Sequence, residues 1–297
     1  MNSARQTTGV PGLDDLLGGG LIPGTLSVII GATGIGKTQM GVHYAHAGIA
    51  EEGCGGVFFD MCSRGDSQNH ANYALRMKNW ELEFADIEPQ INFEAFLSGE
   101  MQLGDYMHIF DYSGKRVTKR DLDWEQWHDW QAQLNHKLTC AIAFLFGNCL
   151  RGTKRVVVDG VEPVGRPNDS IQINLFEYIY HQILRKDPEW VARDLLRVKY
   201  RENAEKVAKL KYDSQSLGCM MLYTSHETML DDMIARPLDE GDTLSNANTL
   251  IYMGKIRDGM KVRRALYIAK HRGSACSEDI IPYHIDDSGI VLDSLSG

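Results

Sequence analysis

Short apolar runs recur along this chain and are separated by longer segments with apolar residues at helical spacing. The clearest runs are residues 26–30, 56–59, 108–110, 155–158 and 220–224. Each is bounded by Gly, Asp or Ser, as is typical of strands that are covered by helices on both faces. The alternation predicts an α/β fold in which a mainly parallel sheet is flanked by helices.

Three segments are predicted to be helical. Residues 169–185 have apolar residues at helical spacing and predict a helix that covers the sheet. Residues 112–150 contain Trp124, Trp127 and Trp130, three residues apart, at the start of a predicted helix. For these residues we favour a buried helical face over a base-stacking or partner surface. Residues 186–213 are rich in Lys and Arg and predict a solvated helix, with a docking or nucleic-acid arm as the alternative.

The C-terminal part has a different pattern. Residues 251–272 predict two antiparallel strands joined at Asp258 and Gly259, a dipeptide suited to tight hairpin turns. The chain has no internal repeat and no low-complexity linker. We therefore expect one domain over 1–297, with helical insertions near 112–150 and 186–213.

The sequence GATGIGKT directly follows the first apolar run and precedes a helical pattern. Its glycines allow the backbone to wrap around an anion, and the amide groups at the start of the following helix point at phosphates. Lys37 would contact the β and γ phosphates, and Thr38 would place its hydroxyl on Mg²⁺. The predicted nucleotide-binding residues are Gly31, Ala32, Thr33, Gly34, Ile35, Gly36, Lys37 and Thr38.

A second acidic element accompanies this loop. The run at 155–158 ends at Asp159, the usual position of the carboxylate that holds Mg²⁺ through water. Asp159 and Thr38 are therefore the predicted metal ligands, and ATP and Mg²⁺ the predicted cofactors. Gly160 follows Asp159, so the adjacent Asp-Glu pair of many ATPases is absent.

Charge and composition restrict the partners. The net charge of −9 does not favour nucleic acid or an anionic membrane, so we expect no specific nucleic-acid binding. No apolar stretch reaches the ~18 residues of a membrane span, and the first ten residues lack the apolar segment of a signal peptide. The six cysteines form no Cys-x-x-Cys pair, which favours free buried thiols in a cytoplasmic protein.

Several motifs together resemble a known family. The segment TTGVPGLDDLLGGGLIPGTLSVIIGATGIGKT at 7–38 is similar to the entry segment of KaiC-like proteins, a branch of the RecA superfamily of P-loop ATPases. KHRGSACSEDIIPYHIDDSGIVL at 270–292 is similar to their Lys-x-Arg-Gly-Ser/Thr segment and closing strands. VVVDG at 156–160 and LYTSHE at 222–227 occur in the expected order between them.

The resemblance implies a RecA-like P-loop NTPase core with a C-terminal antiparallel β-hairpin. It implies that residues 224–227 form the switch strand that senses the γ-phosphate. It also implies a homo-oligomer, a ring that we expect to be a hexamer, with nucleotide between subunits. Lys270 and Arg272 would then reach a neighbour's site as catalytic groups beside Lys37 and Asp159.

One position departs from the family. Cys62 and Ser63 stand where KaiC-like ATPases have a Glu-Glu pair that polarises the attacking water. Neither residue is a carboxylate base, so hydrolysis is expected to be weak or absent. Asp60, Glu162 and Glu227 are the remaining candidates for the base.

Self-phosphorylation, known in KaiC, would use Thr243, Ser245 or Thr249 here, although a polar loop is the favoured interpretation of these residues. The main functional hypothesis is an oligomeric Mg-ATP-dependent ATPase that drives assembly or regulates an unknown protein partner. A nucleotide-gated scaffold with little hydrolysis is the alternative. A RecA-like DNA-binding recombination protein is the minor alternative, which the basic hairpin at 255–272 suggests.

Overall fold

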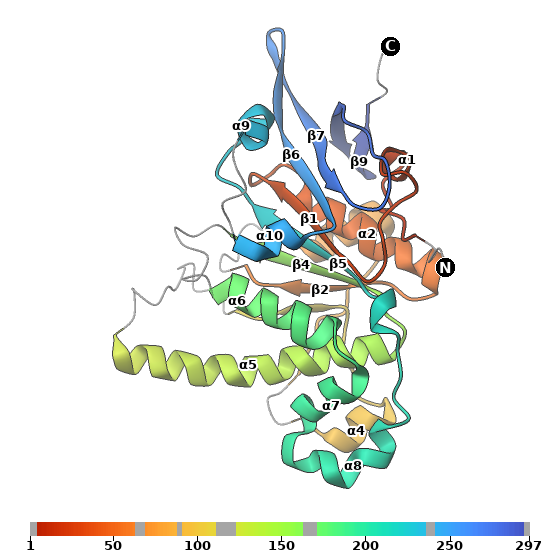
Figure 1. Cartoon of the computed structure of the whole chain (residues 1–297), viewed down its shortest axis with the longest axis vertical. Helices are drawn as coiled ribbons and strands as arrows, with labels where there is room; N and C mark the ends of the chain where they lie inside the picture. The colour runs from red at the N-terminus through yellow and green to blue at the C-terminus, as the bar shows by residue number, and fades with distance from the viewer. Residues whose placement is uncertain are drawn as a thin grey trace.

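The computed structural model describes residues 5–62, 69–87, 91–110, 123–162, 171–235 and 241–293. In these residues a nine-stranded sheet runs in the order β3-β2-β4-β5-β1-β6-β7-β8-β9 (Figure 1). The strands are β1 (Leu26–Gly31), β2 (Val57–Asp60), β3 (Tyr106–His108), β4 (Arg155–Val161), β5 (Gly218–Thr224), β6 (Thr249–Asp258), β7 (Lys261–His271), β8 (Ile280–Asp286) and β9 (Gly289–Leu292).

The sheet is parallel on one side and antiparallel on the other. Every pair from β3 to β6 is parallel, whereas β6, β7, β8 and β9 pair antiparallel in succession. The mainly parallel α/β core and its C-terminal hairpin are thus confirmed. The predicted strand at 108–110 is misplaced along the chain, because β3 begins at Tyr106 and ends at His108. The predicted run at 155–158 is too short, because β4 continues to Val161.

The helices lie on both faces of the sheet and around its edges. Their bounds are α1 (Leu13–Leu16), α2 (Lys37–Glu52), α3 (His70–Lys78), α4 (Phe93–Ser98), α5 (Trp124–Leu150), α6 (Ile171–Tyr178), the π-helix η2 (Ile179–Leu184), α7 (Pro188–Leu196), the 3₁₀ turn η3 (Arg197–Lys199), α8 (Tyr200–Val207), the 3₁₀ turn η4 (Ser214–Ser216), α9 (Leu230–Ala235) and α10 (Gly241–Asn246). The predicted covering helix at 169–185 is therefore an α-helix that widens into a π-helix.

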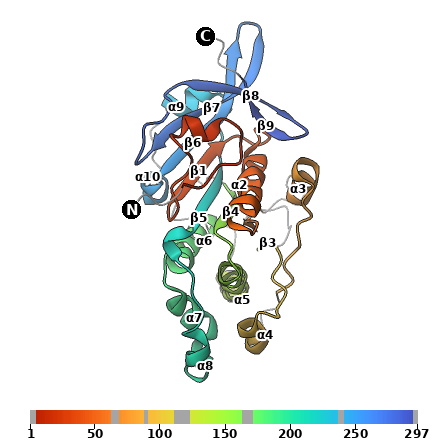
Figure 2. The same ribbon diagram turned by 90° about the vertical axis from the view of Figure 1, so that its right-hand side faces the viewer.

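Side chains of the central strands alternate between two apolar cores. In β1, Val28 and Ile30 pack in the core that includes α5 and α6, whereas Ile29 packs in the core that includes α2. This period of two is expected of strands that are buried on both faces. Figure 2 shows the same layers, with α2 and α5 on opposite sides of the sheet.

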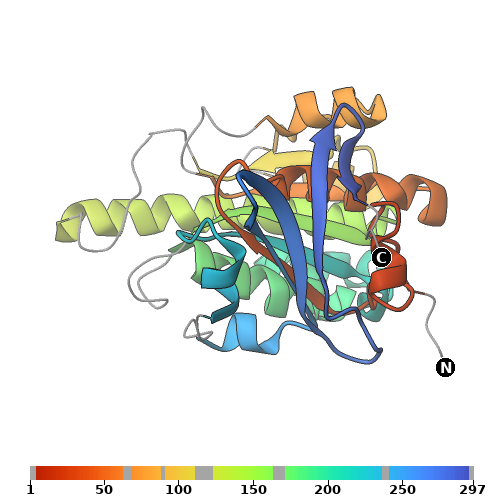
Figure 3. The ribbon, with the colours of Figure 1, turned by 90° about the horizontal axis from the view of Figure 1, so that it is seen from above.

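The two segments that we predicted to be helical insertions differ from the prediction in the exposure of their residues. Trp124 is 77% exposed at the start of α5, which projects beyond the sheet in Figure 3, so the prediction of a buried face is wrong for this residue. The side chains of Trp127 and Trp130 lie outside the described residues. The charged segment forms two helices, α7 and α8, and α7 is not simply solvated, because four of its residues are buried: Val191, Ala192, Leu195 and Leu196.

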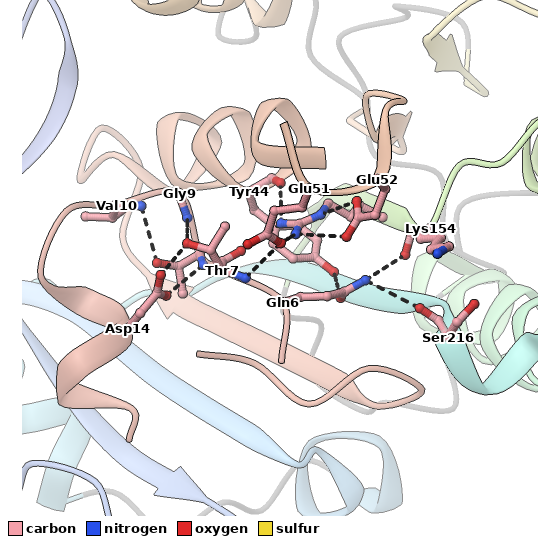
Figure 4. Close-up of polar contacts among 12 residues, drawn as sticks. Gln6, Thr7, Gly9, Val10, Asp14, Tyr44, Glu51, Glu52, Lys154 and Ser216 are labelled. Atoms are coloured by element: carbon pink, nitrogen blue, oxygen red, sulfur yellow. Dashed lines mark hydrogen bonds and ion pairs between the residues drawn. The ribbon is translucent and has the colours of Figure 1, made fainter. Parts of the chain in front are cut away.

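A buried arginine joins the N-terminal segment to the sheet, and its partners Thr7, Tyr44, Glu51 and Glu52 are labelled in Figure 4. Arg155, at the start of β4, is fully buried. Its guanidinium donates to the carboxylates of Glu51 and Glu52 and to the Thr7 carbonyl oxygen. It also lies over the Tyr44 ring, 4.9 Å from the centroid. Ion pairing, hydrogen bonds and a cation–π contact therefore converge on one side chain.

The six cysteines are free thiols, as predicted; four are buried, and Cys54 and Cys276 are half-buried. Among the described helices, none combines the length and apolar character needed to cross a bilayer.

Candidate functional site

The loop between β1 and α2 has the strand–loop–helix context that the sequence predicted. Gly36 precedes α2 with a φ of 113°, a backbone conformation that favours glycine. A Cβ at Gly31 would lie 2.4 Å from the carbonyl oxygen of Met253, so the close approach of β1 and β6 also requires glycine there. Thr33 and Gly34 are exposed at the tip of the loop. The tip of the loop is thus open to solvent beside the N-terminus of a 16-residue helix, where free amide groups favour anions.

Lys37 is held inside this loop. Its Nζ donates to the carbonyl oxygens of Gly31 at 2.8 Å and Ala32 at 3.0 Å. Burial lowers the pKa of Lys37, and the negative charge of Asp159 opposes that effect. The ammonium is therefore positioned at the centre of the loop and has a carboxylate as its main electrostatic partner.

Thr38 and Asp159 meet, as predicted for a metal site. The Thr38 hydroxyl donates to Asp159 Oδ2 at 2.8 Å. Asp159 is placed by a bulge in β4, where the register against β5 shifts between Val158 and Val161. Gly160 follows with a φ of 82°, and a Cβ there would lie 2.3 Å from the Cys62 nitrogen. Gly160 is thus needed for the backbone after β2 to approach β4.

Two oxygen donors side by side fit Mg²⁺, which prefers oxygen ligands and is usually bound through one or two protein groups together with phosphates. The Thr38 hydroxyl and the Asp159 carboxylate would hold the ion, beside the loop whose amides would hold the phosphates.

Sequence reasoning missed His70, which lies against the same carboxylate. His70 is the first residue of α3, and its Nε2 is 3.0 Å from Asp159 Oδ2. Its Nδ1 is 3.7 Å from Asp60 Oδ2. The available signal was its position on α3, because it shares the buried stripe with Ala74 and Met77. A polar residue on such a stripe needs a polar partner.

The electrostatics of this pair are mutually consistent. Burial raises the pKa of Asp159, but the hydrogen bond and charge of His70, with Lys37 and Thr38, outweigh it and hold the pKa below its usual range. Burial lowers the pKa of His70, but Asp159 and then Asp60 outweigh it and raise the pKa above its usual value. Asp159 is therefore an ionised carboxylate, the form in which it would serve a metal ion.

Gln172 was also missed. This buried α6 residue donates through Nε2 to the carbonyl oxygens of Met61 at 2.7 Å and Gly160 at 2.8 Å. Like His70, it is a polar residue on an apolar helical stripe, four residues before Phe176. It ties the chain after β2 to the bulge in β4.

The candidate bases differ in their surroundings. Cys62 is buried, and burial together with Asp159 and Asp60 raises the pKa of its thiol far above its usual value. Asp60 is fully buried, and its carboxylate accepts from the Tyr106 hydroxyl at 2.5 Å and the Cys62 nitrogen at 2.8 Å. Ser63 lies outside the described residues. A neutral thiol and a sequestered carboxylate are both poor bases for water.

Two further carboxylates lie near the loop. Glu162 is half-buried just after β4, and its charge acts on Lys37. Glu227 accepts from the Ser225 hydroxyl in the segment after β5. That segment adjoins the loop, because the Ser225 nitrogen donates to the Gly31 carbonyl oxygen at 3.0 Å. The predicted switch residues 224–227 therefore lie directly beside the phosphate loop.

Lys270 and Arg272 are not part of this cluster. His271, between them, pairs with Thr249 on β6. Thr249 in turn pairs with Ser27, near the start of β1. The loop follows Gly31 at the other end of that strand, about 13 Å farther along. Instead, both cations donate to the Ser245 carbonyl oxygen, Lys270 at 2.6 Å and Arg272 at 3.4 Å.

The residues considered for self-phosphorylation also lie at that far end of the sheet. Thr249 is fully buried and hydrogen-bonded to His271 Nδ1, so it is not accessible in this fold. Ser245 is exposed, and the side chain of Thr243 lies outside the described residues.

Comparisons with known proteins agree on one family. The KaiC ATPase family model matches residues 6–104. The circadian clock protein KaiC3 of Synechocystis is 34% identical over 106 residues, which are 34% of this chain and 21% of that protein. The circadian clock oscillator protein KaiC of Prochlorococcus marinus is 38% identical over 129 residues, which are 40% of this chain and 26% of that protein. The matches thus span about a quarter or less of these relatives' length.

A solved structure is similar over its whole length. It is a KaiC-like protein from the archaeon Pyrococcus horikoshii, with 18% sequence identity and a TM-score of 0.49. The similarity covers 98% of this chain and 99% of that one.

Proposed function

We propose, from the premise that this chain is a KaiC-like protein, that it binds Mg-ATP at the loop Gly31–Thr38 and Asp159 and uses it to control assembly or an as yet unidentified regulatory protein partner. The observation that carries the proposal is the hydrogen bond from the Thr38 hydroxyl to Asp159. This bond brings a hydroxyl at the end of the phosphate loop to the buried, ionised carboxylate of Asp159 on β4. A hydroxyl and a carboxylate in this arrangement are the protein groups that bind the Mg²⁺ of a nucleotide.

In this proposal the chain's own residues bind and neutralise the phosphates. Backbone amides of the loop and the N-terminus of α2 would hold the phosphate oxygens. Lys37 would move from the carbonyl oxygens of Gly31 and Ala32 to the phosphates, exchanging neutral acceptors for charged ones. Mg²⁺, when bound, would neutralise part of the charge between the β and γ phosphates.

Hydrolysis is expected to be slow. The raised pKa of Cys62 excludes it as a base near neutral pH. Glu162 is the best remaining candidate, because it is a half-buried carboxylate close enough to Lys37 for their charges to interact. Replacement of Glu162 by Gln should therefore lower phosphate release while leaving nucleotide affinity within about threefold, since the amide preserves shape and removes the charge.

A head-to-tail oligomer would complete the site. Lys270 and Arg272 lie too far from their own phosphate loop to act there, so their proposed catalytic role requires a neighbouring copy. Repetition of one head-to-tail interface closes into a ring when the rotation allows it, and we propose a hexamer.

The primary test measures binding and turnover separately. Wild type, Lys37→Ala and Asp159→Asn are titrated with a fluorescent ATP analogue in Mg²⁺, and steady-state phosphate release is measured on the same preparations. The proposal expects tight binding by wild type only, with slow phosphate release above the Lys37→Ala level. Equal binding by wild type and Lys37→Ala would contradict it.

The nucleotide-gated scaffold is favoured by one observation, the buried neutral thiol of Cys62 in place of a base. It predicts that wild type binds ATP and changes its oligomeric mass, yet releases phosphate no faster than Lys37→Ala. The same two measurements, with light scattering with and without ATP, therefore separate the scaffold from the ATPase.

A mixing experiment tests the shared site. Lys37→Ala and Arg272→Ala are each expected to be inactive alone. Mixed subunits would form some interfaces in which both halves are wild type, so activity should return on mixing. A strict monomer with and without ATP, or no recovery from two folded variants, would contradict the intersubunit role.

A further inference from the structure

The buried histidine of α3 occupies a position that the proposed function does not explain. His70 is 2% exposed and lies between two acids of neighbouring strands, Asp60 at the end of β2 and Asp159 near the end of β4. These two acids are directly paired in register. The His70 side chain of α3 therefore lies near the carboxyl ends of these two inner strands, where the proposed metal site is built.

The ring of His70 is fixed by its surroundings. It packs edge-on against Phe58, with 5.4 Å between ring centroids, and at a tilt against Tyr106, at 5.1 Å. The Tyr106 hydroxyl donates to Asp60, which fixes Tyr106 against the ring, whereas His70 Nδ1 itself makes no hydrogen bond among the described residues. A ring confined in this way has one orientation in which to meet Asp159.

Three donors from three elements then fix the Asp159 carboxylate. Oδ1 accepts from the Gly160 nitrogen at 2.7 Å. Oδ2 accepts from Thr38 at 2.8 Å and faces His70 Nε2 at 3.0 Å. At this distance an Nε2–H donates to Oδ2, because a carboxylate oxygen is the acceptor of such a pair. Of the two side-chain donors found among the described residues, His70 is the one outside the phosphate loop.

We propose that His70 is a positioning residue for the Mg-nucleotide site, whose Nε2–H holds the Asp159 carboxylate in the orientation that serves Mg²⁺. This inference rests on the proposed binding of Mg-ATP. Hydrogen bonds to a ligating carboxylate typically change metal affinity by about 10–100-fold when removed. A histidine that only filled the core would instead affect folding, and with it both Mg²⁺-dependent and Mg²⁺-independent binding.

The test uses the full chain and the variants His70→Phe and His70→Gln. Phenylalanine keeps a planar ring and removes both nitrogens, whereas glutamine keeps an amide that can donate. His108→Phe is the matched control, because His108 lies on β3 and contacts the Cys62 carbonyl oxygen at 2.7 Å, on the same side of the site. A fluorescent ATP analogue is titrated in Mg²⁺ and in EDTA. The ratio of the dissociation constant in EDTA to that in Mg²⁺, here called the Mg²⁺ increment, is compared between the variants and wild type.

His70→Phe should reduce this Mg²⁺ increment about tenfold or more and leave the EDTA affinity within twofold. His70→Gln should retain part of the increment, and His108→Phe should retain all of it. Electron paramagnetic resonance of Mn²⁺ added to the nucleotide complex gives a second readout that does not depend on turnover.

Four results would overturn the inference. An unchanged Mg²⁺ increment in His70→Phe, or equal losses of affinity in Mg²⁺ and in EDTA, would show that His70 has a structural role only. If His70→Phe does not fold, His70→Gln decides the question. A Mg²⁺ increment in His70→Gln as small as that of Asp159→Asn would then contradict the inference. A wild-type chain without any Mg²⁺ increment would overturn the proposed function and this inference together, so the two failures are distinguishable.

Discussion

The hydroxyl of Thr38 donates to Asp159 across 121 positions of sequence, at 2.8 Å. This contact joins the first turn of α2 to the end of β4 through strands that are not neighbours, because β5 lies between β4 and β1. The proposed metal site is therefore a product of the sheet order.

Removal of that hydroxyl should weaken Mg-nucleotide binding. Thr38→Ala removes both the proposed metal ligand and a donor to Asp159, so we expect the affinity for a fluorescent ATP analogue in Mg²⁺ to fall about tenfold or more. Thr38→Ser keeps the hydroxyl and should stay within about threefold of wild type. Comparable losses in both variants, measured by titration, would show that the hydroxyl is not responsible.

Arg155 should be one of the most sensitive positions for stability. Arg155→Met keeps most of the buried stem but leaves Glu52 without its cationic partner, so we expect a loss of about 3–5 kcal/mol in the free energy of unfolding. Urea denaturation followed by circular dichroism measures this loss.

Arg193→Met is the control for that prediction. Arg193 pairs with Glu189 on the surface of α7, where both side chains are about half exposed. Water screens an exposed pair, so this variant should unfold close to wild type. Similar losses in the two arginine variants would contradict the role assigned to Arg155.

Gly160→Ala should destabilise the fold through backbone crowding. The φ of 82° already disfavours alanine, and the added Cβ would lie 2.3 Å from the Cys62 nitrogen. Strain of about 1–2 kcal/mol comes from the conformation alone, and the contact adds to it. Gly259→Ala, at a φ of 59° with open space around the Cβ, isolates the conformational part. Gly160→Ala should be the less stable of the two in thermal unfolding and should bind Mg-nucleotide more weakly than wild type.

Stability should fall in mild acid because of His43. Its Nδ1 lies 2.9 Å from the Gly9 carbonyl oxygen, and its Nε2 accepts from the Ile290 nitrogen at 3.1 Å, an arrangement that requires the neutral ring. Burial, with the charge of Lys78, lowers the pKa of His43 to about 4. Since the unfolded value is about 6.5, the unfolded chain binds more protons between these pH values.

The free energy of unfolding should therefore decrease as the pH falls from about 6.5 to about 4, by roughly 3 kcal/mol at most from this one group. Urea titrations at several pH values measure the slope. His43→Gln, which has no titrating ring, should show a smaller slope over the same window. An identical slope in wild type and variant would exclude His43 as its source.

Local patterns predicted the elements that depend on neighbouring residues. The apolar run at 26–30, the phosphate loop and the hairpin turn at Gly259 were found because each combines short-range signals. The exposure of Trp124 was mispredicted, because periodicity identifies a helix but not the surface that its first turn meets. The start and end of β3 were displaced for a similar reason, since pairing with β2 fixed them.

The partners of His70 and Gln172 could not be predicted from local patterns. Each of these two residues is a polar residue on an apolar helical stripe, a pattern that indicates an unnamed polar partner. The partners, Asp159 for one and the Met61 and Gly160 carbonyl oxygens for the other, come from distant strands.

The sequence by itself determined the phosphate loop, the acid at Asp159 and the alternation of strands and helices, because each is encoded by residues within one short segment. Only the tertiary structure decided that His70 meets Asp159, that Cys62 is buried against Gly160, and that Lys270 and Arg272 lie at the opposite end of the sheet. These outcomes depend on strand order and register, which are set by burial of two continuous cores and not by any local pattern.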